Sequence, residues 1–185
     1  MAKRKWRKSS LPLASGHGWK GAPGCRVFVA DRGAVRFDIP EAWVLEPDRG
    51  SVKFYDRKPP GDDCCLEMSY LRLPRADWRA LPVAGLVDEV VPAGRPDVER
   101  RLGPFEADRP GIEIAWLEEH YIDPGERRLA RQRTGIARGS GIQCLLTLVY
   151  WADDSDRVEP VWDTVLRTLA LGQWVADPQR GPGPD

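Results

Sequence analysis

The sequence has few of the residues on which common enzyme and metal sites depend. In 185 residues there are two histidines, His17 and His120, and four cysteines. The cysteines form no Cys-x-x-Cys pair and no Cys/His cluster with metal spacing. A P-loop and the motifs GxSxG and HExxH are also absent. We therefore expect no metal, no cofactor and no catalytic residue, and these absences favour a non-catalytic protein.

The sequence also lacks the signals of membrane insertion and secretion. No run approaches the ~20 apolar residues of a membrane span, and Leu11–Ala14 is too short for the apolar part of a signal peptide. We therefore expect a cytoplasmic protein whose four thiols are free. Adjacent residues of a strand point to opposite faces, so we expect one of Cys64 and Cys65 in the core and the other at the rim. The remaining two are Cys25 and Cys144.

Net charge is absent as well, because 28 basic residues balance 28 acidic ones. A neutral chain has no general attraction to nucleic acid or to a membrane. Six cations nevertheless lie before Cys25 with no acid among them, so the rest of the chain carries about −6 by subtraction from zero. This basic arm leaves weak binding to an anionic surface open as one alternative.

The glycine and proline pattern predicts one domain with two tails. Residues 1–24 and 175–185 are rich in chain-breaking residues and lack apolar periodicity, so we expect a disordered basic arm and a disordered tail. Residues 25–174 then form a single domain, a usual size for one hydrophobic core.

Within this domain, apolar alternation and turn residues predict mostly strands. Helical spacing predicts a helix over 83–90 and a final helix that begins near 153–155 and ends before Gly172. The expected strands cover 25–30, 35–39, 43–45, 52–55, 64–73, 98–105, 112–121, 127–138 and 142–151.

The final helix carries the clearest apolar stripe, which must pack on a sheet face. Its members are Val158, Val161, Trp162, Val165 and Leu169. We therefore predict an α+β fold, with a twisted, mainly antiparallel sheet and helices on both faces.

Two segments resemble the PsbP-like domain family. The stretch from Phe37 to Trp43 is similar to the early strand-Pro-x-x-Trp step of these domains, and 158–169 is similar to their final helix, with the apolar strand 142–151 directly before it. The resemblance spans about Cys25 to Leu171. It implies a three-layer α/β/α sandwich with an antiparallel sheet. Function does not carry over, because the roles within the family differ and no functional residue matches.

A hairpin register gives the candidate binding residues. If Pro124-Gly125 is the turn, Glu118 lies opposite Arg131, and Trp116 lies opposite Arg133. Both pairs then fall on one face. Arginine and tryptophan are residue types that anchor interfaces, so these four residues are a candidate recognition surface. The alternative is a solvated cross-strand ladder.

The same counting tests for a Cys–His dyad. It places Cys144 opposite Gly135, six residues from the row of His120, or about 20 Å, which is too far for a dyad. A meeting of His120 with Cys64 or Cys65 stays open. We expect the acidic pairs at 62–63, 118–119 and 153–154 to be solvated or to cap helices.

Three functional hypotheses remain. The first is a non-catalytic domain or adaptor that binds another protein. The second is a small-molecule-binding protein or enzyme that uses the sheet rim. The third is weak anionic-surface binding through the arm. A deep cleft with converging polar groups favours the second, whereas a large exposed apolar patch favours the first.

Overall fold

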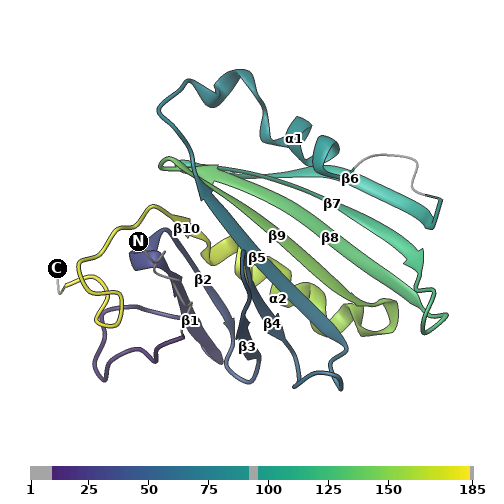
Figure 1. The fold of residues 1–185 in the computed structure, drawn as a ribbon, viewed down its shortest axis with the longest axis horizontal. Helices are drawn as coiled ribbons and strands as arrows, with labels where there is room; N and C mark the ends of the chain where they lie inside the picture. The colour runs from purple at the N-terminus through teal and green to yellow at the C-terminus, as the bar shows by residue number, and fades with distance from the viewer. Residues whose placement is uncertain (1–9, 92–95, 184–185) are drawn as a thin grey trace, which may run out of the picture.

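The computed structural model describes residues 10–91 and 96–183, whose strands form two antiparallel sheets (Figure 1). The alternating apolar residues noted above place one side of most strands in the core. The strands are β1 (Cys25–Ala30), β2 (Val35–Pro40), β3 (Val44–Pro47), β4 (Val52–Tyr55), β5 (Cys64–Arg72), β6 (Val98–Arg109), β7 (Ile112–Ile122), β8 (Leu129–Gly139), β9 (Ile142–Trp151) and β10 (Ala170–Leu171).

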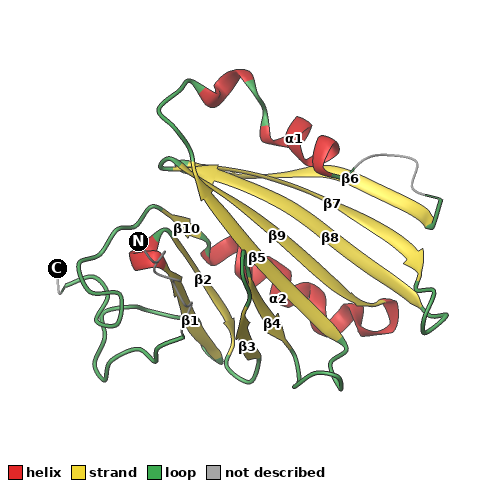
Figure 2. Ribbon diagram, in the orientation of Figure 1, coloured by secondary structure: helices red, strands yellow, loops and turns green. Residues whose placement is uncertain are grey.

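The smaller sheet has the order β1-β2-β10, and the larger has the order β3-β4-β5-β9-β8-β7-β6. Two α-helices accompany them in the described residues, α1 (Val83–Val90) and α2 (Ser155–Thr168) (Figure 2). Short 3₁₀ segments occupy Asp31–Gly33, Trp78–Ala80 and Ala152–Asp154. The predicted α+β class with antiparallel sheets is confirmed, although the helices are few.

The helix α2 supplies the centre of the main core. Val158, Trp162, Val165 and Leu169 are fully buried, and Val161 is half-buried, so the predicted stripe is confirmed. These residues pack against β2 and β9. Burial of this much apolar surface is the main stabilising contribution to such a domain.

The helix ends earlier than the sequence predicts, at Thr168 instead of just before Gly172. Ala170 and Leu171 leave the helix to pair with β2. Arginine side chains bind the freed carbonyl groups, since Arg109 Nη1 donates to the carbonyl oxygens of Leu166 and Leu169, each 2.7 Å away. Side-chain donors of this kind satisfy the last turn of a helix.

The β7–β8 register differs from the prediction by two residues. Glu118 pairs with Arg133, and Trp116 pairs with Gly135. The predicted partners, Arg131 for Glu118 and Arg133 for Trp116, are therefore wrong. A shift of two residues keeps every side chain on its original face of the sheet. The residues therefore stay together while their partners change.

The cause is a longer loop than the predicted Pro124-Gly125 turn. The last strand pair is Ile122 with Leu129, which leaves residues 123–128 in the loop. The Asp123 carboxylate accepts hydrogen bonds from the backbone N–H groups of Gly125 (2.9 Å) and Glu126 (2.8 Å). An aspartate that binds its own backbone in this way stabilises a loop that strand propensity alone does not reveal.

The β8–β9 hairpin turns at Ser140-Gly141 instead of the predicted Gly139-Ser140. Gly139 still pairs with Ile142. Ser140 and Gly141 have φ values of 49° and 71°. Positive φ at both central residues is the type I′ pattern, which matches strand twist. This register also differs by two residues from the predicted one.

The described parts of the arm and tail pack on each other, which differs from the expected disorder. The indole Nε1 of Trp19 donates to the carbonyl oxygen of Pro178 at 2.8 Å, and Trp19 is 5% exposed. The backbone N–H of Ala14 donates to the carbonyl oxygen of Gln179 at 2.9 Å. The expectation that both ends lack packing is thus wrong here, because each end supplies a partner for the other. The cations among residues 1–9 and the last two residues lie outside the described residues.

Candidate functional site

Three of the four predicted binding residues belong to a partly buried polar cluster between α2 and the ends of β7, β8 and β9. We call it the Glu118 cluster. Its members are Glu118, His120, Arg131, Arg133, Tyr150 and Glu159.

Glu118 is the centre of this cluster. Its carboxylate lies 2.5 Å from Arg133 Nε and 2.6 Å from His120 Nε2. The Tyr150 hydroxyl is 3.4 Å from Glu118 Oε2. Glu159 of α2 completes the network, with its two oxygens each 2.9 Å from a guanidinium nitrogen of Arg131 or Arg133. The cluster thus ties α2 to the sheet.

The electrostatics of Glu118 follow from these contacts. Burial acts to raise the pKa of its carboxyl group, but hydrogen bonds from His120 and Arg133 outweigh burial and hold the pKa below its ordinary value. Burial likewise acts to lower the pKa of Arg133, and the Glu118 contact overcomes it, so that pKa is raised. Both groups are therefore charged at neutral pH.

This arrangement does not form the exposed recognition surface that the sequence suggested. Glu118 and Glu119 are 5% and 1% exposed, so the expectation that this acidic pair is solvated is wrong. The side chains of Arg133 and Arg131 are 12% and 26% exposed. Each predicted charge already has a partner of opposite sign. The cluster therefore resembles a buried structural network more than a docking surface.

Trp116, the fourth predicted residue, lies two positions before Glu118 in β7, so its side chain is on the same face of the sheet. Its ring centroid is 5.6 Å from that of Phe105, and Trp116 is half-buried. It also adjoins Trp162 across Gly135, where an added Cβ would meet both tryptophans within 3.2 Å. Trp116 is therefore mainly a packing residue, beside the cluster instead of within it.

The geometry also excludes the Cys–His dyads. His120 pairs with Arg131, and Cys144 pairs with Ala137, six residues along β8 and about 20 Å away. Cys64 lies level with His120 across the sheet, but β9 and β8 lie between their strands. The two residues are therefore about 14 Å apart. No cysteine reaches this imidazole. As expected, Cys64 is buried and Cys65 is half-buried.

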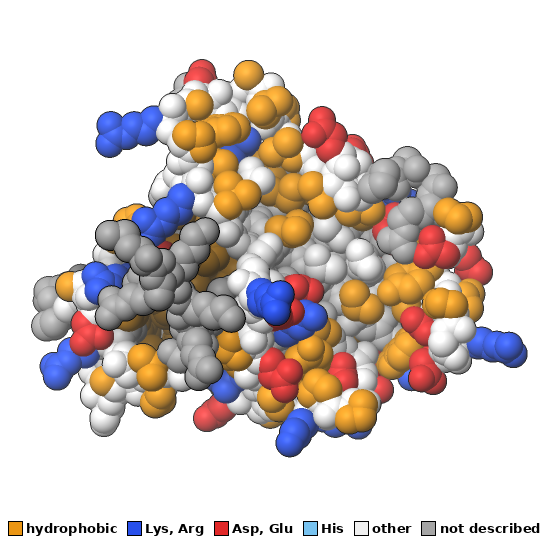
Figure 3. All heavy atoms as spheres, in the orientation of Figure 1, with side chains coloured by type: hydrophobic (Ala, Val, Ile, Leu, Met, Phe, Trp, Pro, Cys, Tyr) orange, Lys and Arg blue, Asp and Glu red, His pale blue; other side chains and the backbone are white. Residues whose placement is uncertain are grey.

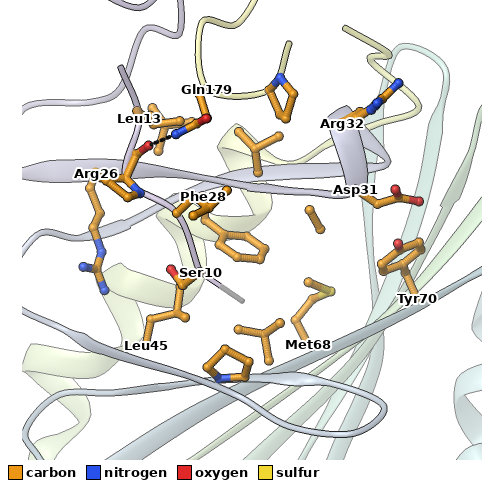
Figure 4. A pocket seen from close by; sticks show the side chains of 18 of the residues that line it. Ser10, Leu13, Arg26, Phe28, Asp31, Arg32, Leu45, Met68, Tyr70 and Gln179 are labelled. Atoms are coloured by element: carbon orange, nitrogen blue, oxygen red, sulfur yellow. Dashed lines mark hydrogen bonds between the residues drawn. The ribbon is translucent and has the colours of Figure 1, made fainter. Parts of the chain in front are cut away.

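A second site is a cleft of about 940 Å³ between the smaller sheet and the β3-β4-β5 end of the larger sheet (Figure 4). We call it the inter-sheet cleft. Its middle is apolar, as Figure 4 shows, and its main apolar lining residues are Leu13, Phe28, Leu45, Val52 and Met68. Volumes of roughly 300–1,000 Å³ with apolar linings are typical of small-molecule sites.

The two ends of the inter-sheet cleft are polar. Figure 4 shows Arg26 on one side and Asp31, Arg32 and Tyr70 on the other. The Asp31 carboxylate lies 2.6 Å from Arg72 Nη2. Burial, followed by the charge of the Asp31 carboxylate, raises the pKa of Tyr70 to about 12. Polar groups at the ends of an apolar surface are the usual means of orienting a ligand.

Residues of the arm and tail form part of the cleft wall. Gln179 Nε2 donates to the carbonyl oxygen of Pro12 at 2.9 Å, a bond drawn in Figure 4. His17 also lines the cleft, and its Nδ1 is buried without a hydrogen-bond partner among the described residues. The backbone N–H of His17 donates to the carbonyl oxygen of Ala14 at 3.2 Å.

Sequence reasoning missed the inter-sheet cleft because its walls come from distant segments. One usable signal was β1, where Arg26 and Phe28 alternate with residues of the opposite face.

Three arm glycines, Gly16, Gly18 and Gly21, have dinucleotide-loop spacing. They precede β1 instead of joining a strand to a helix, so they lack the structural context of that motif.

The surface offers little else in the described residues. On the face in Figure 3, acidic and basic side chains are interspersed, and hydrophobic side chains gather over the segment that leads into α1. Leu81, which precedes α1, and Val90, the last residue of α1, are about half exposed. Among residues 10–91 and 96–183, no group of three His, Cys, Asp or Glu side chains could hold a metal ion. No helix in the same ranges is long and apolar enough to span a membrane.

Comparison with known proteins identifies relatives in sequence. The family model Alr1449 matches residues 26–175. The uncharacterized protein alr1449 of Nostoc sp. (strain PCC 7120) is 43% identical over 187 residues, which covers 98% of this chain and 97% of that protein.

Solved structures identify the fold. The cyanobacterial PsbP (CyanoP) of Synechocystis sp. PCC 6803 superimposes with a TM-score of 0.56 at 16% identity, covering 86% of this chain and 98% of that one. The Ran-binding protein Mog1p of Saccharomyces cerevisiae gives a TM-score of 0.51 at 6% identity, covering 80% and 95%. The PsbP-like fold predicted from the sequence is thus confirmed, and at these identities the likeness concerns the fold alone.

Proposed function

This chain belongs to the Alr1449 family, and we propose that it is a small-molecule-binding protein that holds a mainly apolar ligand in the inter-sheet cleft. The observation that carries the proposal is the cleft itself, with an apolar middle between polar ends. The alternative polar site, the Glu118 cluster, is centred on a buried carboxylate and is internally neutralised. It offers a ligand little free hydrogen-bonding capacity.

The lining supports a binding role more than a catalytic one. Among the residues lining the cleft, those with nucleophilic or acid–base chemistry include Cys25, His17, Asp31 and Glu41. Burial raises the pKa of the Cys25 thiol, which disfavours the reactive thiolate. Asp31 is engaged by Arg72. We therefore place the protein among non-catalytic binders.

A neutral naphthylamine dye tests this proposal. Its fluorescence rises when it leaves water for an apolar site, and we expect saturable binding by the full chain. Leu45→Gln places a polar amide on the cleft side of β3 and should weaken binding about tenfold. That is the loss expected when one leucine no longer supplies apolar contact.

Glu46→Gln is the matched control, because Glu46 is the exposed next residue of β3. It should bind the dye as the unmodified chain does. Equal binding by both variants would contradict the cleft as the site, provided circular dichroism shows that both are folded.

Binding to another protein is the second candidate. It is favoured by Trp174, which is 50% exposed and stacks on the Arg72 guanidinium at 4.7 Å. Exposed tryptophan and arginine are frequent anchors of interfaces. Trp174→Ala should remove a co-purifying partner without loss of dye binding if this role exists.

The location and the finer architecture are also proposals. The four free cysteines agree with a reducing cytoplasm.

We further propose that the larger sheet is the middle layer of an α/β/α sandwich. In support, Leu117 and Ile136 pack on α1, whereas alternate residues of the same strands, Trp116 and Gly135, adjoin Trp162 of α2. Anionic-surface binding through residues 1–9 concerns a segment outside the described residues.

A further inference from the structure

The inter-sheet cleft is unequal in charge at its two ends. The Asp31 carboxylate is bound by Arg72 at 2.6 Å. Its charge is therefore already balanced. The nearby Arg32 is exposed, and Figure 4 shows its side chain directed away from the middle of the cleft. Arg26 lies on the opposite side, near Ser10 and Leu45.

Arg26 retains most of its hydrogen-bonding capacity. Its Nη2 donates to the carbonyl oxygen of Trp43, which fixes the position of the guanidinium. Within the described part of the chain, no carboxylate forms an ion pair with Arg26. A guanidinium has five N–H donors in a planar fork, and this geometry matches a carboxylate. A fixed cation with free donors beside an apolar surface is a site for an anion.

We propose that the cleft binds an anionic amphiphile, a carboxylate with an unbranched apolar chain, in a defined direction. The carboxylate binds Arg26, and the chain lies over Phe28, Leu45 and Met68 toward Tyr70. This inference rests on the proposed small-molecule function and names its ligand class. The length is suitable, since β1 from Arg26 to Ala30 spans about 13 Å of the wall.

Among the described residues, the carboxylate of Glu41 also bears on the head-group end. Glu41 lines the cleft and lies two residues before Trp43, the residue whose carbonyl oxygen holds Arg26. Its exposed carboxylate opposes a bound anion. Removal of that charge should strengthen anion binding, whereas removal of the Arg26 charge should weaken it. If the substitutions of Arg26 and Glu41 change the affinity for the anion in opposite directions, the effect comes from charge and not from altered packing.

The experiment is displacement of the naphthylamine dye by dodecanoate and by dodecanol, below their aggregation limits, from the full chain. The two competitors share one carbon chain and differ in the head group. We expect dodecanoate to bind about tenfold more tightly, as one charge-assisted contact predicts. Arg26→Gln should bring the ratio of the two affinities to about one, and Glu41→Gln should increase it. Arg100→Gln, an exposed change on β6, should leave the ratio unaltered.

The outcomes separate this inference from the function on which it rests. If the dye does not bind, both fail. If the dye and dodecanol bind but dodecanoate has no advantage, the cleft is a small-molecule site and the anionic head is wrong. If Arg26→Gln weakens both competitors equally, Arg26 only supports the fold of the cleft, and the inference is overturned.

Discussion

The indole Nε1 of Trp19 donates a hydrogen bond to the carbonyl oxygen of Pro178, 2.8 Å away and 159 positions distant in sequence. Gly181 makes this contact possible, because an added Cβ there would lie 2.7 Å from the indole ring. The bond joins the two ends of the described chain. It also holds together the segments that supply Pro12 and Gln179 to the wall of the inter-sheet cleft.

We therefore expect Trp19→Ala to lower the free energy of unfolding by about 3 kcal/mol, near the lower limit for a buried aromatic side chain. Urea unfolding measures this directly. Leu11→Ala is the control, since Leu11 is 65% exposed and its change should have little effect. Equal stability of the two variants would show that the ends do not pack in solution.

The core of α2 gives a second prediction. Trp162 is fully buried, so Trp162→Ala should cost about 3–5 kcal/mol. Gly135→Ala should cost about 1–3 kcal/mol, because its Cβ would lie 3.1 Å from Cη2 of Trp162. Thermal unfolding of the two variants checks both values. If Gly135→Ala left the thermal stability unchanged, β8 would not pack closely against the Trp162 indole.

The Glu118 cluster predicts a pH dependence of stability. The pKa of Glu118 is lowered in the folded state, so its ionised form stabilises the fold. This contribution is fully present above the pKa of an unfolded glutamate and is lost as the pH falls through the folded value. Glu118→Gln should therefore cost about 1–3 kcal/mol at neutral pH. It should then lose less stability than the unmodified chain as the pH falls to about 3.

Urea unfolding at several pH values measures this difference. Glu99→Gln is the control, because Glu99 is exposed on β6. Parallel stability curves for the unmodified chain and Glu118→Gln would refute the role of this carboxylate.

Thiol reactivity gives a fourth prediction. Burial raises the pKa of Cys64 to about 12 and of Cys65 to about 11, and it also raises that of the fully buried Cys144. The native protein should therefore react slowly with a disulfide reagent at mildly alkaline pH. All four thiols should react once the chain is unfolded without a reductant. Fewer than four would reveal a disulfide and contradict the reducing location that we propose.

The sequence predicts the elements well because their signals are local. The stripe that contains Val158, Trp162 and Val165 repeats at helical spacing, and each of these residues is buried as expected. Alternation in β2 likewise marks the core face of that strand, where Val35, Phe37 and Ile39 are buried. Such patterns depend on neighbours within a few positions, which the sequence displays directly.

The register and the inter-sheet cleft depend on information that is not local. Hydrogen bonds to the Asp123 carboxylate stabilise a longer loop between β7 and β8, and positive φ at Ser140 shifts the turn between β8 and β9. The pairing register of each hairpin therefore differs by two residues from the prediction. Arg26 and Met68 line the same cleft although 42 positions separate them, as their residue numbers show. No period in the sequence links two strands of different sheets.

Binding of an amphiphilic ligand in the inter-sheet cleft can be observed residue by residue by NMR titration of the labelled chain with dodecanoate. We expect saturable amide shifts concentrated at Arg26, Phe28, Leu45, Val52 and Met68, with small shifts in α1, which does not line the cleft. Shifts that centre on α1, or no saturable shifts at all, would contradict it.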